Sequence, residues 1–183
     1  QGKEAGLSEI QLYEAVLNLV PYIGYPRTLN TMGRFQKVYP NYVKERAGGK
    51  EPQSTEPWSQ YAAGPWVERS DNIRQQLGVG GPGAEELVNQ LSSLSPELAD
   101  WARYDAFGRI FGRPGLSLLE RESVVMGALV AQGVPQFIVH HKALLRVGGT
   151  AALVDEIFKE VADIVDAKAL TISRQYLAEA RKK

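Results

Sequence analysis

Apolar positions along the chain recur at intervals of three and four residues, which is the spacing of amphipathic helices. Near the N-terminus, Ser8 and Gln11 form a candidate capping box, and the apolar residues after them predict a helix with one buried face. Pro21 and the turn at 24–26 should end or kink this helix, because proline lacks the amide donor of a helical residue. A second helix is predicted from about residue 27 until shortly before residue 40.

The same spacing predicts a series of helices in the second half of the chain. Ser95, followed by a proline, is a candidate N-cap, Ser117 and Glu120 form a second candidate capping box, and Thr150 is a candidate N-cap for a third helix. The expected helices are one through 98–104, one at 118–132, a return helix at 136–146, one after residue 150, and an amphipathic tail at 171–183.

Between these helical regions, residues 40–69 are polar and rich in helix breakers, and they predict a loop or linker. Trp58, Tyr61 and Trp66 interrupt the polar run, and such large apolar rings usually find a surface to pack on. We therefore expect this segment to wrap a neighbouring repeat or subunit. The glycine cluster at 78–83 is followed by no Lys-Ser/Thr pair, so it predicts a flexible connection rather than a phosphate loop.

Two stretches of the chain match each other. The pattern that leads from Gly6 to Glu14 recurs from Gly148 to Glu156, at a constant offset of 142 residues. The chain therefore has the pattern of two repeat-like halves. Nothing before Gly6 corresponds to the 118–147 hairpin, so the first half lacks its opening helices, and either the native chain begins earlier or this copy has lost them. The surface left uncovered favours a homo-oligomer.

Composition sets limits on the class of protein. The length of 183 residues suits one shared hydrophobic core, and 21 basic residues balance 21 acidic ones, which leaves no positive excess for nucleic acid. The apolar runs are too short to cross a bilayer, and no basic-then-apolar leader precedes them. We expect a soluble protein with no membrane span, and the cytoplasm is favoured over secretion. The chain contains no cysteine.

Candidate chemistry concentrates in residues 107–141, which contain both histidines of the chain. Glu122 and His140 lie on the two arms of the predicted 118–146 hairpin. Counted from its turn at about 1.5 Å per residue, they lie roughly 16 and 10 Å along the arms, an offset of about 6 Å that two side chains largely span. A structural interpretation stays open: His140 and His141 as one buried and one exposed imidazole, and Glu120 and Glu122 as first-turn acids that favour the helix dipole. A metal site is not indicated, since adjacent histidines point about 100° apart on a helix and no third ligand is evident.

Taken together, the stretch Arg109-Ile-Phe-Gly-Arg-Pro-Gly-Leu116, the Glu120-Arg-Glu122 triplet and His140 eight residues before Gly148 resemble the carboxymuconolactone decarboxylase family. The resemblance covers residues 98–165 and extends to residues 6–32. It implies the all-α, alkylhydroperoxidase D-like helical fold of that family. It divides the chain into a partial N-terminal repeat (1–39), a loop-rich connecting segment (40–95), a C-terminal repeat (96–170) and a helical tail (171–183).

The resemblance also implies a function. Peroxidase-like members need a Cys-x-x-Cys pair, and this cysteine-free chain has 134–137 in that loop, so thiol peroxidase activity is excluded. Decarboxylase-like members are cofactor-free lyases, for which His140 and Glu122 would form a proton relay on a small carboxylate or lactone. Arg113, Arg121 and His141 are the expected substrate-binding residues, with neither cofactor nor metal. The alternative is a family member that has lost catalysis and serves as a structural or assembly subunit.

Overall fold

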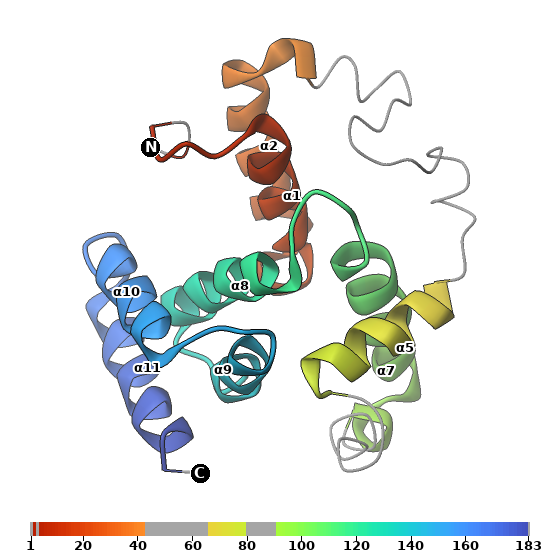
Figure 1. Cartoon of the computed structure of the whole chain (residues 1–183), viewed down its shortest axis with the longest axis vertical. Helices are drawn as coiled ribbons and strands as arrows, with labels where there is room; N and C mark the ends of the chain where they lie inside the picture. Colours follow the sequence, from red (N-terminus) through yellow and green to blue (C-terminus); the bar gives the residue numbers. More distant parts are fainter. Residues whose placement is uncertain (1, 3, 43–65, 80–90, 183) are drawn as a thin grey trace.

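The computed structural model describes residues 2, 4–42, 66–79 and 91–182. Within these ranges all regular secondary structure is helical, which confirms the expected all-α class (Figure 1). The helices are α1 (Glu9–Asn18), α2 (Val20–Val38), α5 (Trp66–Leu77), α7 (Pro96–Trp101), the π-helix η1 (Ala102–Phe111), α8 (Leu118–Gln132), α9 (Phe137–Arg146), α10 (Ala151–Val161) and α11 (Ala167–Ala180).

Helix α8 is the central element of the fold. It contacts α9, α10 and α11 on the C-terminal side, and α1 and α2 on the N-terminal side (Figure 1). Its residues Val125, Met126 and Val130 are fully buried, and they belong to a core cluster that also includes Leu144 and Val154 from α9 and α10. Since burial of each such side chain contributes about 1.5–3 kcal/mol, this cluster is a major source of stability.

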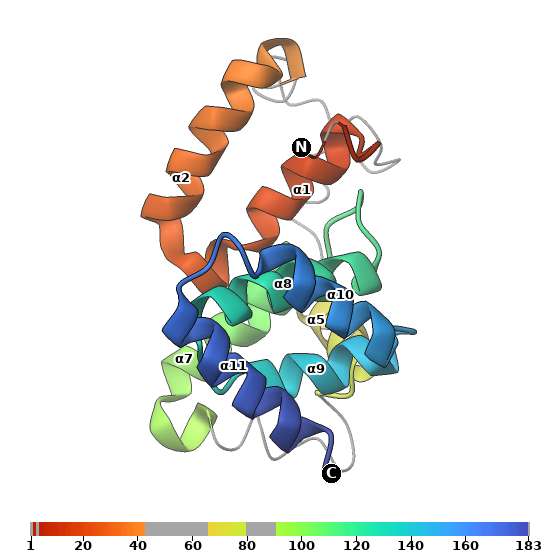
Figure 2. The same ribbon diagram turned by 90° about the vertical axis from the view of Figure 1, so that its left-hand side faces the viewer.

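Helices α1 and α2 form a pair that projects from this core (Figure 2). A second small cluster holds the pair together, with Ile10 from α1, Phe35 from α2 and Tyr39, the residue that follows α2. The first helix ends at Asn18, before Pro21, and α2 starts at Val20 rather than near residue 27. The turn expected at 24–26 is a kink within α2, where Gly24 has a φ of 74° that glycine adopts without the steric cost of a Cβ.

The four predicted capping residues are confirmed. Ser8 with Gln11 and Ser117 with Glu120 each form a complete capping box, and the hydroxyls of Ser95 and Thr150 accept hydrogen bonds at the starts of α7 and α10. The turn after α8 is closed by a glycine in the left-handed conformation. Side-chain capping of otherwise unpaired amides therefore sets where these helices begin.

Three segments differ from the sequence prediction. The loop expected up to residue 69 ends earlier, because α5 starts at Trp66 and packs against η1; its Ile73 and Leu77 join the main core, although its other positions are mostly polar. The helix predicted through 98–104 runs on to Phe111, with π-helical hydrogen bonding from Ala102. The tail helix starts at Ala167 rather than residue 171. The aromatic residues 58 and 61 and most of the 78–83 glycine cluster lie outside the described residues.

In the part of the chain that the structure describes, no helix has both the length and the apolar character needed to cross a membrane.

Candidate active site

Glu122 and His140 lie in direct contact. Helix α8 carries Glu122 in its second turn, and α9 returns after a tight turn and places His140 opposite it. Oε2 of Glu122 lies 2.8 Å from Nδ1 of His140. The glutamate side chain is fully buried, whereas the histidine side chain is 15% exposed. The structure thus brings together the two residues that the spacing argument paired.

This geometry fixes the roles of the two imidazole nitrogens. With Glu122 ionised, its carboxylate accepts a hydrogen bond from the Nδ1–H of His140, which leaves Nε2 as the ring nitrogen that Glu122 does not bind. The other carboxylate oxygen, Oε1 of Glu122, is buried and has no hydrogen-bond partner among the described residues. A buried carboxylate with one unsatisfied oxygen is costly, and such costs concentrate at functional sites.

Tyr22 completes the surroundings of the pair. Its ring meets the imidazole of His140 edge to face, with the ring centroids 5.2 Å apart. Burial, and next the negative charge of Glu122, raise the pKa of the Tyr22 hydroxyl well above its ordinary value, so the phenol stays protonated. Tyr22 was not among the residues expected from the sequence. The only signal was its position in the Pro21-Tyr22-Ile-Gly24 turn, and the turn alone does not show what the ring contacts.

Arg113 is turned toward Glu14 of α1. Its guanidinium donates two hydrogen bonds to this carboxylate, at 2.8 and 2.7 Å, and both side chains are almost fully buried. The turn after η1 makes this approach possible, since Gly115 has a φ of 94° and a Cβ there would meet the Glu14 side chain at 2.9 Å. The Arg-Pro-Gly turn therefore holds Arg113 in a buried ion pair with Glu14.

Arg121 belongs to the same network. It is fully buried, lies 3.5 Å from Glu14, and donates hydrogen bonds to the Asn18 side chain and to the carbonyls of Arg113 and Pro114. Asn18 in turn donates to the Arg121 carbonyl. The two arginines that the sequence assigned to substrate binding thus share one carboxylate, and their contacts join α1 to the start of α8.

His141 lies on a different side of α9 from His140. Its ring stacks on Phe137, it is only 4% exposed, and its Nδ1 has no hydrogen-bond partner among the described residues. Burial, and then the positive charges of Arg181 and Lys142, lower the pKa of His141 below its ordinary value. The structure therefore does not place His141 beside Glu122, and its surroundings are those of a neutral, packed imidazole.

Glu120 is a capping residue in the structure. Its carboxylate accepts hydrogen bonds from the backbone amide and hydroxyl of Ser117 and from the side chain of Gln11. The bond from the Ser117 amide is the main reason that the pKa of Glu120 is lowered. The structural interpretation of this residue therefore fits its contacts. Across the described residues, no group of three histidine, aspartate or glutamate side chains is arranged to bind a metal ion.

Comparisons of the chain with protein-family models, with curated proteins and with solved structures find no match. The structure alone therefore describes the protein: it is all-helical in the described residues, with a buried carboxylate–histidine pair where α8, α9 and the start of α2 meet.

Proposed function

We propose that this protein is a cofactor-free enzyme that performs acid/base chemistry on a small carboxylated, lactone-type substrate. The observation that carries the proposal is the 2.8 Å contact between fully buried Glu122 and partly exposed His140. A histidine held at Nδ1 by a carboxylate presents Nε2 in a fixed direction, which is how many enzymes position a general acid or base. The lactone class comes from the family resemblance.

The proposed reaction is a decarboxylation. The bond between the substrate carbon and its carboxylate breaks, carbon dioxide leaves, and the electron pair delocalises into the conjugated carbonyl system. His140, protonated, then delivers its Nε2 proton to carbon, and Glu122 stabilises the imidazolium before this transfer. Solvent returns a proton to Nε2, which the exposed part of the ring permits. Neutral Tyr22, packed on the imidazole, shields the pair from bulk water on one side.

A role in substrate binding for Arg113, Arg121 and His141 remains part of the proposal, direct for the two arginines and indirect for His141. Since both guanidinium groups contact Glu14, a substrate carboxylate would have to compete with that residue for Arg113, which is the more exposed of the two. His141 would act by supporting the position of α9 rather than by touching the substrate.

The finer fold assignment is also a proposal. We infer that the chain has the alkylhydroperoxidase D-like arrangement with two repeat-like halves. In support, α1 and α10 both begin at a hydroxyl N-cap, at Ser8 and Thr150, and both pack on α8.

A second candidate function is assembly. The projecting α2 exposes Leu29 and Val38, which are 67% and 62% exposed and lie on opposite flanks of the helix. Apolar residues in such positions are favourable contacts for a second copy. We propose that the chain is a homo-oligomer, and that assembly would be its main role if the relay is inactive.

The test of the relay is an NMR titration of His140. His141→Gln leaves His140 as the single histidine of the chain, so its imidazole signals are unambiguous. We expect the titration midpoint to move by at least half a pH unit when one member of a panel of small lactones and dicarboxylates is added. The same compound should lose carbon dioxide in the presence of the wild-type protein, and His140→Gln and Glu122→Gln should each slow this release at least 100-fold.

The outcome that contradicts the proposal is equally definite. If the titration midpoint of His140 stays the same with every compound, and His140→Gln assembles as the wild type does, the proton relay is rejected and the assembly function is favoured.

A further inference from the structure

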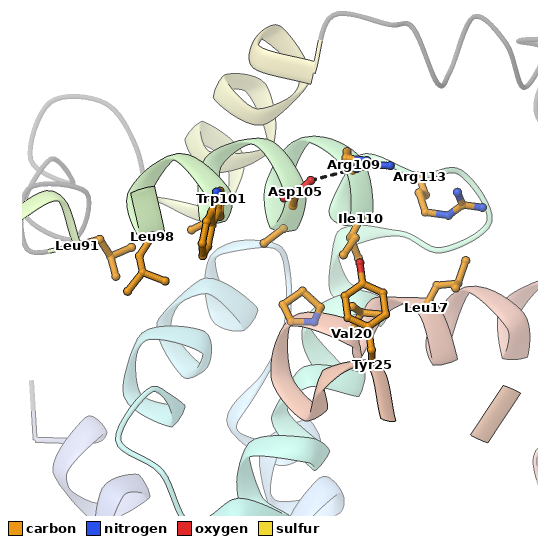
Figure 3. A pocket seen from close by; sticks show the side chains of 13 residues that line it. Leu17, Val20, Tyr25, Leu91, Leu98, Trp101, Asp105, Arg109, Ile110 and Arg113 are labelled. Carbon is orange, nitrogen blue, oxygen red and sulfur yellow. Dashed lines mark hydrogen bonds and ion pairs between the residues drawn. The ribbon is translucent and has the colours of Figure 1, made fainter. Parts of the chain in front are cut away.

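An open cleft with a volume of about 690 Å³ lies between α7 and η1 on one side and the start of α2 on the other. Figure 3 shows its two walls: one carries Leu98, Trp101 and Ile110 from α7 and η1, and the other carries Val20 and Tyr25 from the region where α2 begins. The volume lies within the range of about 300–1,000 Å³ that small-molecule sites occupy in proteins. The cleft is therefore large enough for a ligand with one or more rings.

The walls of this cleft are apolar and unusually exposed. Tyr25 is 73% exposed, Trp101 61% and Leu98 49%. Large apolar side chains around a concave surface are typical of ligand sites, because a bound ligand removes these side chains from water and so gains favourable free energy. Burying the exposed parts of such side chains is worth roughly 25 cal/mol per Å².

Charges at the cleft are already balanced within the protein. Arg109 forms an ion pair with Asp105, at 3.3 Å, and Arg113 is bound to Glu14. Asp105, Arg109 and Arg113 line the cleft (Figure 3), and Glu14 holds Arg113 from outside the lining. Since an added charge would have to compete with these pairs, the lining is complementary to an uncharged molecule.

The backbone of one wall is also unusual. Ala102, Ala106 and Ile110 line the cleft from η1, a π-helix of ten residues. π-Helical segments are rare and occur frequently at functional sites. Here the wider turns are combined with two alanines, whose short side chains leave the space that the cleft occupies.

We propose that this cleft binds an uncharged, mainly apolar small molecule that contains at least one ring. The inference goes beyond the proposed enzyme function and does not depend on it, because binding here needs no proton transfer. The cleft is nonetheless close to the relay along the chain: Val20 and Pro21 line it, and the next residue, Tyr22, packs on His140. An occupant would therefore lie against the segment that positions Tyr22.

The experiment uses N-phenyl-1-naphthylamine, an uncharged ring compound whose fluorescence rises in apolar surroundings. It is titrated into the full chain, which contains three tryptophans, and the difference in tryptophan-to-compound energy transfer between wild type and Trp101→Phe reports the part that comes from Trp101. We expect saturable binding of one molecule per chain. Leu98→Asp places a charge on the cleft wall and should weaken binding at least tenfold. Leu145→Asp is the matched control, because Leu145 is a helical leucine of similar exposure, 40%, outside the cleft lining, and binding should stay within twofold.

Three results would overturn the proposal. The first is binding that does not saturate. The second is an equal loss of affinity in both aspartate variants while their circular dichroism spectra stay unchanged. The third is a Leu98→Asp variant that dissociates an oligomer and binds more of the compound, which would make a second copy of the chain the occupant of the cleft. His140→Gln should bind the compound as the wild type does. Binding of the compound by His140→Gln therefore tests the cleft independently of the proton relay.

Discussion

His141 gives the clearest residue-scale consequence of this packing. Its pKa in the folded protein is lowered by burial and then by Arg181 and Lys142. Below the ordinary histidine pKa of about 6.5, the unfolded chain therefore binds a proton that the folded chain does not. We expect the free energy of unfolding to fall as the pH drops from 7.5 to 5.5, with a slope of at most about 1.4 kcal/mol per pH unit from this residue.

The measurement is urea unfolding at pH 7.5 and 5.5, for wild type and His141→Gln. The variant should show the smaller loss of stability over this interval, whatever its absolute stability. His140 is present in both proteins, so its contribution largely cancels. Identical losses in the two proteins would show that the environment of His141 does not favour the neutral imidazole.

Glu14 supports a second prediction at the residue scale. It is fully buried and is the common partner of Arg113 and Arg121. Glu14→Gln removes the charge that compensates these guanidinium groups, so we expect a loss of about 3–5 kcal/mol in the free energy of unfolding. The matched control is Glu156→Gln, which breaks the exposed pair with Lys159 and should cost about 1 kcal/mol or less. Equal costs in denaturant titrations would contradict a structural role for the network.

At the scale of elements, the start of α8 positions Glu122, and its capping box is open to test. Ser117→Ala removes the hydroxyl that accepts a hydrogen bond from the Glu120 amide, at 3.2 Å, and should lower stability by about 1 kcal/mol. Ser123→Ala on the same helix is the control, because that hydroxyl only donates back to the Leu119 carbonyl and alanine is the better helix former. Thermal unfolding of both variants is the measurement: Ser117→Ala should unfold at a lower temperature than Ser123→Ala, and equal unfolding temperatures would contradict a stabilising role for the cap.

Elements were predictable from the sequence where a local signal defines them. Capping side chains at Ser8, Ser117 and Thr150 act within three residues, so the pattern alone locates the helix starts. Helix α5 was missed at its start because tertiary packing on η1, not local periodicity, supports a mostly polar segment. The π-helical hydrogen bonding of η1 has no comparable sequence signal.

The candidate site shows the same division. The Glu122–His140 contact lies within one hairpin, so counting residues from its turn sufficed to pair them. The partners of Arg113 and Arg121, by contrast, come from Glu14 and Asn18, about a hundred residues away. The family resemblance and their charge made these arginines candidates for a substrate carboxylate, and the sequence held no sign that α1 supplies a carboxylate to them.

At the scale of the whole molecule, the proposed homo-oligomer can be tested on the projecting α1–α2 pair. The pair contacts the main body through α1 and α2, and Leu29 of α2 is 67% exposed although its neighbour Thr28 is buried. We expect sedimentation velocity to show a species larger than one chain of 20.2 kDa. Leu29→Asp should shift it toward the monomer, because burying a carboxylate between copies is costly. Leu145→Asp, on α9, should leave the species unchanged. A monomer at every concentration would reject the assembly function, and the relay would then have to operate within one chain.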